Sequence, residues 1–128
     1  MLTLGKHLII EISDVAEPSM LRDATFLDNL LRTAAEKSGA TTLNSFFHHF
    51  GGDHGVTGVV ALAESHISIH TWPEHGYAAI DIFVCGKCNP VAAQDYIQLN
   101  LAGNYRSLLM ERGFDKKTTT NVIQSSQK

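Results

Sequence analysis

The chain can be read outward from residues 64–74, which are Glu64-Ser65-His66-Ile67-Ser68-Ile69-His70-Thr71-Trp72-Pro73-Glu74. Apolar and polar residues alternate over 66–71, so this part predicts a strand with Ile67 and Ile69 on one face. The composition of residues 72–76 predicts a turn. Residues 77–85 alternate in the same way, and place Asp81 and Cys85 on the face opposite their apolar neighbours. Both stretches therefore read as strands with one apolar face.

More strands and two helices are predicted on either side of this stretch. The strands cover 8–12, 41–50, 56–63 and, as a short piece, 108–110. One helix opens at Pro18 and closes at Gly39; the other is capped by Asn89 and runs to about residue 103. This order predicts a single α+β domain over residues 1–128: a two-layer sandwich with a largely antiparallel sheet and helices on one face. The polar residues 115–128 are expected to form a flexible tail.

Composition excludes several classes of function. The 128 residues are 44% hydrophobic and 18% charged, as in an ordinary globular domain. A net charge of −3 gives no electrostatic reason to expect nucleic acid or an anionic membrane as partner. No apolar run reaches the length of a membrane span, and the first residues lack a signal-peptide pattern. With two cysteines, we expect a cytoplasmic protein whose thiols are reduced.

Ser65 is the first residue to which chemistry can be assigned. No G-x-S-x-G motif surrounds it, so a hydrolase nucleophile is not supported. It follows Glu64 at the junction of two strand-like runs, with an imidazole five residues further on. Self-cleavage at this bond needs a strained peptide and a nearby proton acceptor. Strict alternation would turn Ser65 away from His70, so this interpretation requires a kink at the Glu64–Ser65 bond.

The histidines and cysteines suggest two other kinds of site. His66 and His70 would lie ~13 Å apart along one strand, too far for a shared ion, so we predict no metal site. Cys85-Gly86-Lys87-Cys88 fits the C-x-x-C pattern of redox proteins. From the residues alone, a non-enzymatic protein that uses these cysteines and histidines to bind metal or to exchange thiols remains an alternative.

The region from Gly55 to Gly86, with ESHISIHTWPE at its centre, resembles the short bacterial and archaeal S-adenosylmethionine decarboxylases. The similarity extends to residues 4–7 (LGKH) and 38–41 (SGAT). These are pyruvoyl enzymes of polyamine and spermidine synthesis, made as proenzymes that cut themselves at a Glu-Ser bond. The resemblance implies cleavage into residues 1–64, the β chain, and 65–128, the α chain. It agrees with the predicted fold.

The resemblance also assigns roles to individual residues. Ser65 would become the pyruvoyl group after the bond to Glu64 is cut, and His70 would assist processing. Thr57 stands where the family usually has a serine that helps processing; it keeps the hydroxyl but adds a methyl group. Cys85 would be the catalytic proton donor.

The resemblance implies a substrate and an assembly as well. The pyruvoyl carbonyl would form a Schiff base with the amine of S-adenosylmethionine and accept the electrons released with CO2. An adenine and a sulfonium call for aromatic and acidic groups, for which Phe50, Trp72 and Glu74 are candidates. A homodimer with its sites at the interface is implied. Arginine or ornithine as the substrate of a related decarboxylase is the alternative.

Overall fold

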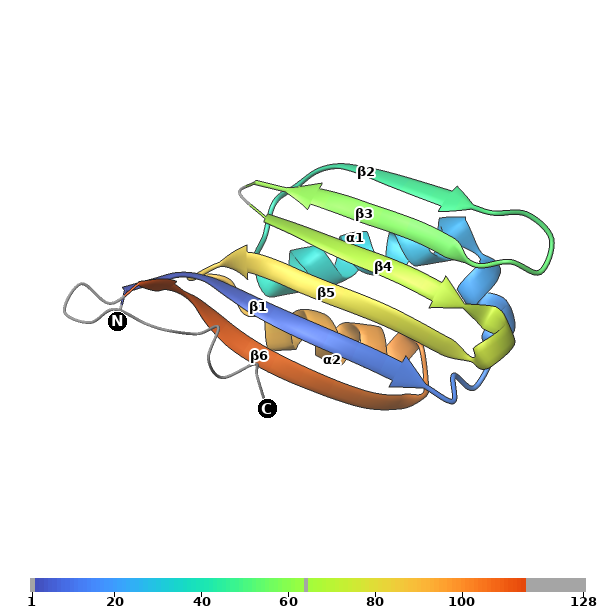
Figure 1. Ribbon diagram of the computed structural model, residues 1–128. Coiled ribbons are helices and arrows are strands. Elements are labelled where there is room, and N and C mark those ends of the chain that lie inside the picture. The colour runs from blue at the N-terminus through green and yellow to red at the C-terminus, as the bar shows by residue number, and fades with distance from the viewer. Residues whose placement is uncertain (1, 64, 115–128) are drawn as a thin grey trace.

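The computed structural model describes residues 2–63 and 65–114, and within them one antiparallel sheet is covered on one face by α-helices (Figure 1). The strand order is β2-β3-β4-β5-β1-β6. This confirms the predicted α+β sandwich. The predicted tail, residues 115–128, lies outside the described residues. The elements are β1 (Leu2–Ser13), η1 (Pro18–Arg22), α1 (Ala24–Ser38), β2 (Thr42–His49), β3 (Val56–Leu62), β4 (Ser65–Trp72), η2 (Pro73–His75), β5 (Tyr77–Cys85), α2 (Pro90–Asn100) and β6 (Asn104–Phe114).

The core lies between the sheet and the helices. As the alternation in the sequence predicts, Ile67 and Ile69 of β4 and Ile82 of β5 are fully buried there. The amphipathic face of α1 packs Leu27 and Leu31 against them. Because burying an aliphatic side chain is worth roughly 1.5–3 kcal/mol, this layer fixes which residues of each strand point away from the helices. We call that opposite side of the sheet the open face.

The helix predicted from Pro18 to Gly39 is in fact two elements. The segment η1 is a 3-10 helix that ends before Asp23, whose backbone is extended. The carboxylate of Asp23 then accepts a hydrogen bond from the N–H of Phe26 at 3.0 Å and caps α1. Gly39 ends α1 in the left-handed conformation, as predicted. The break lets the chain turn from the end of β1 into the helix layer.

The strands β1 and β6 are longer than predicted, whereas β2 is slightly shorter than the predicted 41–50. The strand expected at 108–110 is β6, which pairs with β1 along most of its length. Edge strands such as β6 are held by backbone hydrogen bonds rather than by burial, so their sequence lacks a clear alternation. The second helix ends at Asn100, before the predicted residue 103. In the part of the chain that the structure describes, no helix has the length and apolar character needed to span a membrane.

Candidate active site

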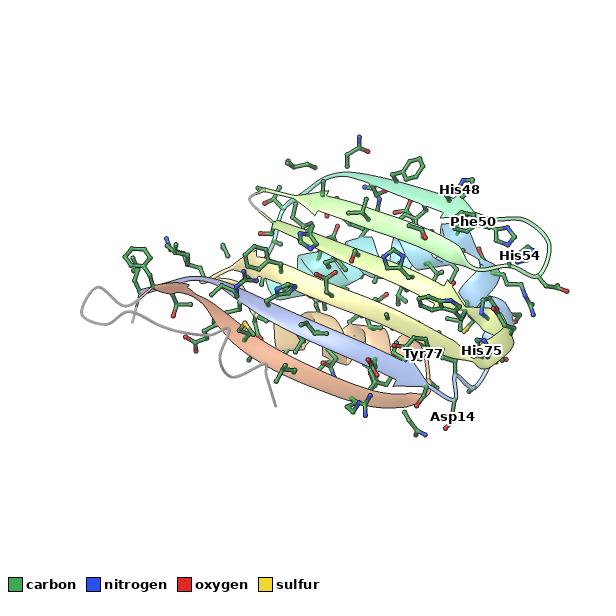
Figure 2. All side chains as sticks on the ribbon, viewed as in Figure 1. Asp14, His48, Phe50, His54, His75 and Tyr77 are labelled. Carbon is green, nitrogen blue, oxygen red and sulfur yellow. The ribbon has the colours of Figure 1, made fainter. Side chains whose placement is uncertain are left out.

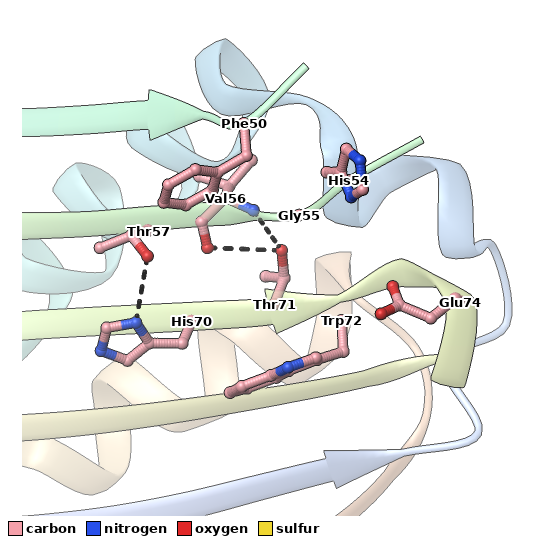
Figure 3. A pocket seen from close by; sticks show the side chains of 9 residues that line it. All are labelled: Phe50, His54, Gly55, Val56, Thr57, His70, Thr71, Trp72 and Glu74. Carbon is pink, nitrogen blue, oxygen red and sulfur yellow. Dashed lines mark hydrogen bonds between the residues drawn. The ribbon is translucent and has the colours of Figure 1, made fainter. Parts of the chain in front are cut away.

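A cavity of about 460 Å³ opens where β3 begins and β4 ends. It lies against the loop that joins β2 to β3 and against the turn η2 (Figure 3). Five residues singled out from the sequence for processing or substrate binding meet there. The side chains that line it are Phe50, His54, Gly55, Val56, Thr57, His70, Thr71, Trp72 and Glu74.

Thr57 and His70 form a hydrogen-bonded pair on the wall of this cavity. The β3–β4 register places them directly opposite each other, with Oγ1 of Thr57 3.2 Å from Nδ1 of His70. Both side chains lie on the open face, because their neighbours Val56 and Ile69 point into the core. The contact fixes the orientation of the imidazole and leaves Nε2 directed away from Thr57, so the ring can exchange a proton with a bound group.

The floor of the cavity is formed by the buried hydroxyl of Thr71 and by the backbone of Gly55, which contacts the backbone of Thr71. Oγ1 of Thr71 accepts a hydrogen bond from the N–H of Val56 at 2.8 Å and donates one to the carbonyl of Leu21 at 2.7 Å. A Cβ atom on Gly55 would lie 2.0 Å from the carbonyl oxygen of Thr71. Glycine is therefore required for the loop to approach β4, and this approach shapes the cavity.

Two aromatic rings and a carboxylate form the rim. Phe50 is 59% exposed and Trp72 41% exposed. His48 contacts the Phe50 ring edge-on at 4.6 Å between centroids (Figure 2), and Tyr77 lies 5.4 Å from Trp72. Exposed, supported rings can stack on a planar ligand. Glu74 adds a negative charge at the mouth of the cavity.

Ser65 and Cys85 lie at the other end of these strands. Ser65 begins β4 opposite Leu62, and its hydroxyl donates to the carbonyl of Ala63 at 3.4 Å. Because His66 pairs with Phe83, the β4–β5 register places Cys85, at the end of β5, next to Ser65, at the start of β4. Residues 65–72 alternate regularly, so Ser65 shares the face of Ile67. The bond on which the predicted kink depends includes residue 64, which lies outside the described residues.

Within one copy of the chain, His70 lies far from Ser65 and Cys85, although the roles that the resemblance assigns would require the three residues to meet. His70 pairs with Thr57 on one side and Ala79 on the other. It lies five residues from Ser65 along an extended strand, which is ~17 Å. An extended strand cannot fold back on itself, so the two groups occupy opposite ends of β4.

Sequence reasoning missed a polar cluster in the middle of the open face. Asp81 accepts hydrogen bonds from Nε2 of His7 at 2.7 Å, from Nε2 of His66 at 3.0 Å and from the hydroxyl of Ser68. Arg112 lies 3.0 Å from Nδ1 of His7, so that nitrogen accepts and Nε2 carries the proton given to Asp81. A carboxylate within an otherwise apolar strand was the signal that could have revealed the cluster.

These contacts account for the charge on Asp81. Burial alone would raise its pKa, but the hydrogen bonds from Ser68, His7 and His66 together hold the pKa of Asp81 below its usual value. Two histidines and one carboxylate are also a donor set that binds transition metals. Here both imidazole nitrogens already contact the same oxygen of Asp81, so hydrogen bonding explains the arrangement.

Comparison with known proteins identifies the family of the chain. A family model described as S-adenosylmethionine decarboxylase matches residues 6–113. An S-adenosylmethionine decarboxylase proenzyme of Parasynechococcus marenigrum is 55% identical over 83 residues, 65% of this chain and 63% of that protein, slightly less than two thirds of its length. The proenzyme of the same name from Prochlorococcus marinus is 43% identical over 116 residues, 90% of this chain and 89% of the relative. The crystal structure of the adenosylmethionine decarboxylase from Aquifex aeolicus superposes with a TM-score of 0.80 at 35% identity, covering 94% of this chain and 99% of that one.

Proposed function

The chain belongs to the S-adenosylmethionine decarboxylase family, and from this premise we propose that it decarboxylates S-adenosylmethionine with a pyruvoyl group made from its own Ser65. The observation that carries the proposal is the cavity in which Phe50, Trp72 and Glu74 surround the Thr57–His70 pair. Aromatic rings suit the adenine and the sulfonium, and a carboxylate offsets the positive charge. The product would be decarboxylated S-adenosylmethionine, an aminopropyl donor for spermidine synthesis.

Self-processing is the first step of this proposal. The hydroxyl of Ser65 attacks the carbonyl carbon of Glu64, and an ester forms as the peptide C–N bond breaks. β-Elimination then releases residues 1–64 and leaves a dehydroalanine, whose imine form is hydrolysed by water to the pyruvoyl group and ammonia. Ser65 suits this role because its side chain is partly exposed where β3 turns into β4. Among the described residues, its hydroxyl makes one long hydrogen bond, to the carbonyl of Ala63. An imidazole paired with a hydroxyl, as in His70 and Thr57, can move the protons that this rearrangement requires.

Once formed, the pyruvoyl group supplies a carbonyl that withdraws the electrons left when CO2 departs. The residues of the chain bind the substrate and protonate the product. Phe50 and Trp72 hold the adenosyl part, and Glu74 lies near the positive sulfur. Cys85, at the same edge of the sheet as Ser65, donates the proton to the carbon that lost CO2.

We propose further that each site is completed by a second copy of the chain. Within one copy, Ser65 lies ~17 Å from His70 along β4, and Cys85 lies ~20 Å along β5 from the partner of His70. This separation supports a site whose two halves come from different copies. The open face carries a set of exposed apolar residues, which favours an interface between copies. Two copies can stack their open faces against each other, related by a two-fold axis that lies between the faces and perpendicular to the strands. This arrangement would set the Ser65 end of one copy over the His70 end of the other. The exposed apolar residues are Ile9, Phe46, Val59, Leu108 and Met110.

The activity is tested by incubating the purified protein with carboxyl-labelled S-adenosylmethionine and measuring released CO2. Arginine and ornithine, the alternative substrates, are tested in the same assay. Release from S-adenosylmethionine alone is expected, because Phe50 and Trp72 have no role toward an aliphatic amino acid. Release from arginine or ornithine instead would refute the proposed substrate.

The shared site is tested by co-expressing two variants that are each expected to be inactive. Ser65→Ala lacks the nucleophile but keeps the Thr57–His70 cavity, whereas His70→Ala keeps Ser65 and Cys85. Mixed dimers then hold one intact site, so random pairing restores about a quarter of the wild-type sites. The His70→Ala chain should be cut in the mixture and not alone. If each site lay within one copy, the mixture would stay uncut and inactive.

A further inference from the structure

Cys85 and Cys88 lie within reach of each other in the turn that follows β5. Their sulfur atoms are 3.5 Å apart. The N–H of Cys88 donates to the carbonyl of Cys85 at 3.0 Å, which closes the turn that brings the two residues together. The proposed decarboxylation uses one of these thiols and leaves the other without a role.

The turn is held firmly against the first strand. The N–H of Gly86 donates to the carbonyl of Leu4 at 3.0 Å, and Lys6 reaches the carbonyl of Cys88 at 3.4 Å. A Cβ atom on Gly86 would lie 2.9 Å from the carbonyl oxygen of Thr3, so the close contact depends on glycine. A turn fixed in this way keeps the two sulfurs together in the reduced protein.

We propose that Cys85 and Cys88 form a reversible disulfide and make the turn a site of oxidation by small disulfides such as oxidised glutathione. Closing the bond requires the sulfurs to move from 3.5 Å to ~2.05 Å, a change that rotation about the two side chains supplies without displacement of the strand. No other part of the fold has to open, because the partners are already adjacent.

The exposure of the two cysteines determines which thiol attacks the small disulfide first. Cys85 is partly exposed, whereas Cys88 is 9% exposed. The thiolate of Cys85 attacks one sulfur of the small disulfide; a mixed disulfide forms and one thiol leaves. The thiolate of Cys88 then attacks the sulfur of Cys85, and the second thiol leaves. Two protein thiols are oxidised, one small disulfide is reduced, and the two protons end on the released thiols.

The second step, in which Cys88 attacks, should depend on pH. Burial raises the pKa of the Cys88 thiol, the neighbouring Cys85 raises it further, and Lys6 opposes this shift in part. Since the thiolate is the attacking form, closure should speed up as the pH rises from neutral.

The consequence for activity rests on the proposed function. A sulfur held in a disulfide carries no proton, so Cys85 could not act as proton donor until the bond was reduced. Cleavage between Glu64 and Ser65 does not use this thiol and should be unaffected. Oxidation would therefore switch off decarboxylation in a protein that is already processed.

The test is the mass of the whole purified protein after incubation with oxidised glutathione, an acid quench and alkylation of remaining thiols. The chain that holds both cysteines should be lighter by two hydrogen atoms, take up no alkyl group and carry no glutathione. Reduction with dithiothreitol before the alkylation should restore two alkyl groups. Wild-type protein that keeps glutathione, or whose two thiols are both still alkylated, would overturn the proposal.

Cys88→Ser is the matched control. It retains Cys85 and should be as active as wild type before oxidation. After oxidation it should hold one glutathione, because no second thiol displaces it. Activity measured alongside separates the two proposals: wild-type activity should fall in proportion to the oxidised fraction and return on reduction. A disulfide that forms without loss of activity would contradict the catalytic role of Cys85 and leave the oxidation site established.

Discussion

Replacing Asp81 by asparagine should destabilise the fold by about 2–3 kcal/mol at neutral pH. The carboxylate accepts hydrogen bonds from His7, His66 and Ser68 and is only 25% exposed. A hydrogen bond to a charged group is worth about 1.5–3 kcal/mol and one between neutral groups about 0.5–1.5 kcal/mol. Asparagine keeps the volume but not the charge, so three bonds each lose roughly 1 kcal/mol, less the share that water recovers.

The stability difference between wild type and Asp81→Asn should depend on pH. The pKa of Asp81 is lower in the folded protein than in the unfolded chain. Its contribution to stability is therefore complete above the unfolded value of about 4 and is lost as the pH falls through the folded value. Asparagine does not titrate, so the stability gap between wild type and Asp81→Asn should shrink below about pH 4.

Urea unfolding at one fixed protein concentration measures this gap from pH 7 to pH 2.5. Asp95→Asn on α2 is the control, because Asp95 is exposed and its substitution should change stability by at most about 0.5 kcal/mol at any pH. A gap for Asp81→Asn that stays constant down to pH 2.5, or that grows in acid, would show that the three hydrogen bonds do not stabilise the charged carboxylate.

The remaining predictions concern the site. Cys85→Ser should still be cut at Ser65 but decarboxylate ~10²–10⁴ times more slowly, as measured by CO2 release, because a serine is a far weaker acid. It should also lose activity progressively, since misplaced protonation converts the pyruvoyl terminus to alanine. An equal loss of activity in Cys85→Ser and Cys88→Ser would instead favour a redox role for the two thiols. Phe50→Ala should raise KM for S-adenosylmethionine about two- to tenfold through loss of stacking, whereas Leu99→Ala on the exposed side of α2 should not; equal effects would remove Phe50 from the binding site. Prolonged treatment with a chelator should leave CO2 release unchanged, and activity that needs added zinc would contradict a metal-free mechanism.

The sequence predicted the sheet well wherever one face of a strand is buried. A period of two over residues 66–71 and 77–85 fixes which side chains enter the core, so the positions of Ile67, Ile69 and Ile82 could be stated in advance. The break between η1 and α1 was harder. Proline at position 18 suggested a single helix start, whereas the residue that caps α1 is Asp23, and both patterns are common at helix N-termini.

The candidate site shows the limit of the same reasoning. Thr57 and His70 meet because one short hairpin sets their register, which the local sequence largely determines. The cluster at Asp81 instead needs His7, which lies 74 residues away in sequence, and no local pattern specifies the pairing of such distant strands. The ~17 Å between Ser65 and His70 follows from strand geometry alone. The proposal of a site shared by two copies also depends on the exposed apolar residues of the open face, which no local pattern groups together.

The intact mass of the purified protein shows whether the chain cuts itself and converts Ser65 to a pyruvoyl group. Two chains are expected, residues 1–64 and residues 65–128, the second lighter by one ammonia than a chain that begins with serine. Ser65→Ala should give one uncut chain. Wild-type protein that remains a single chain after long incubation, or a second chain that begins with an unmodified serine, would contradict the account.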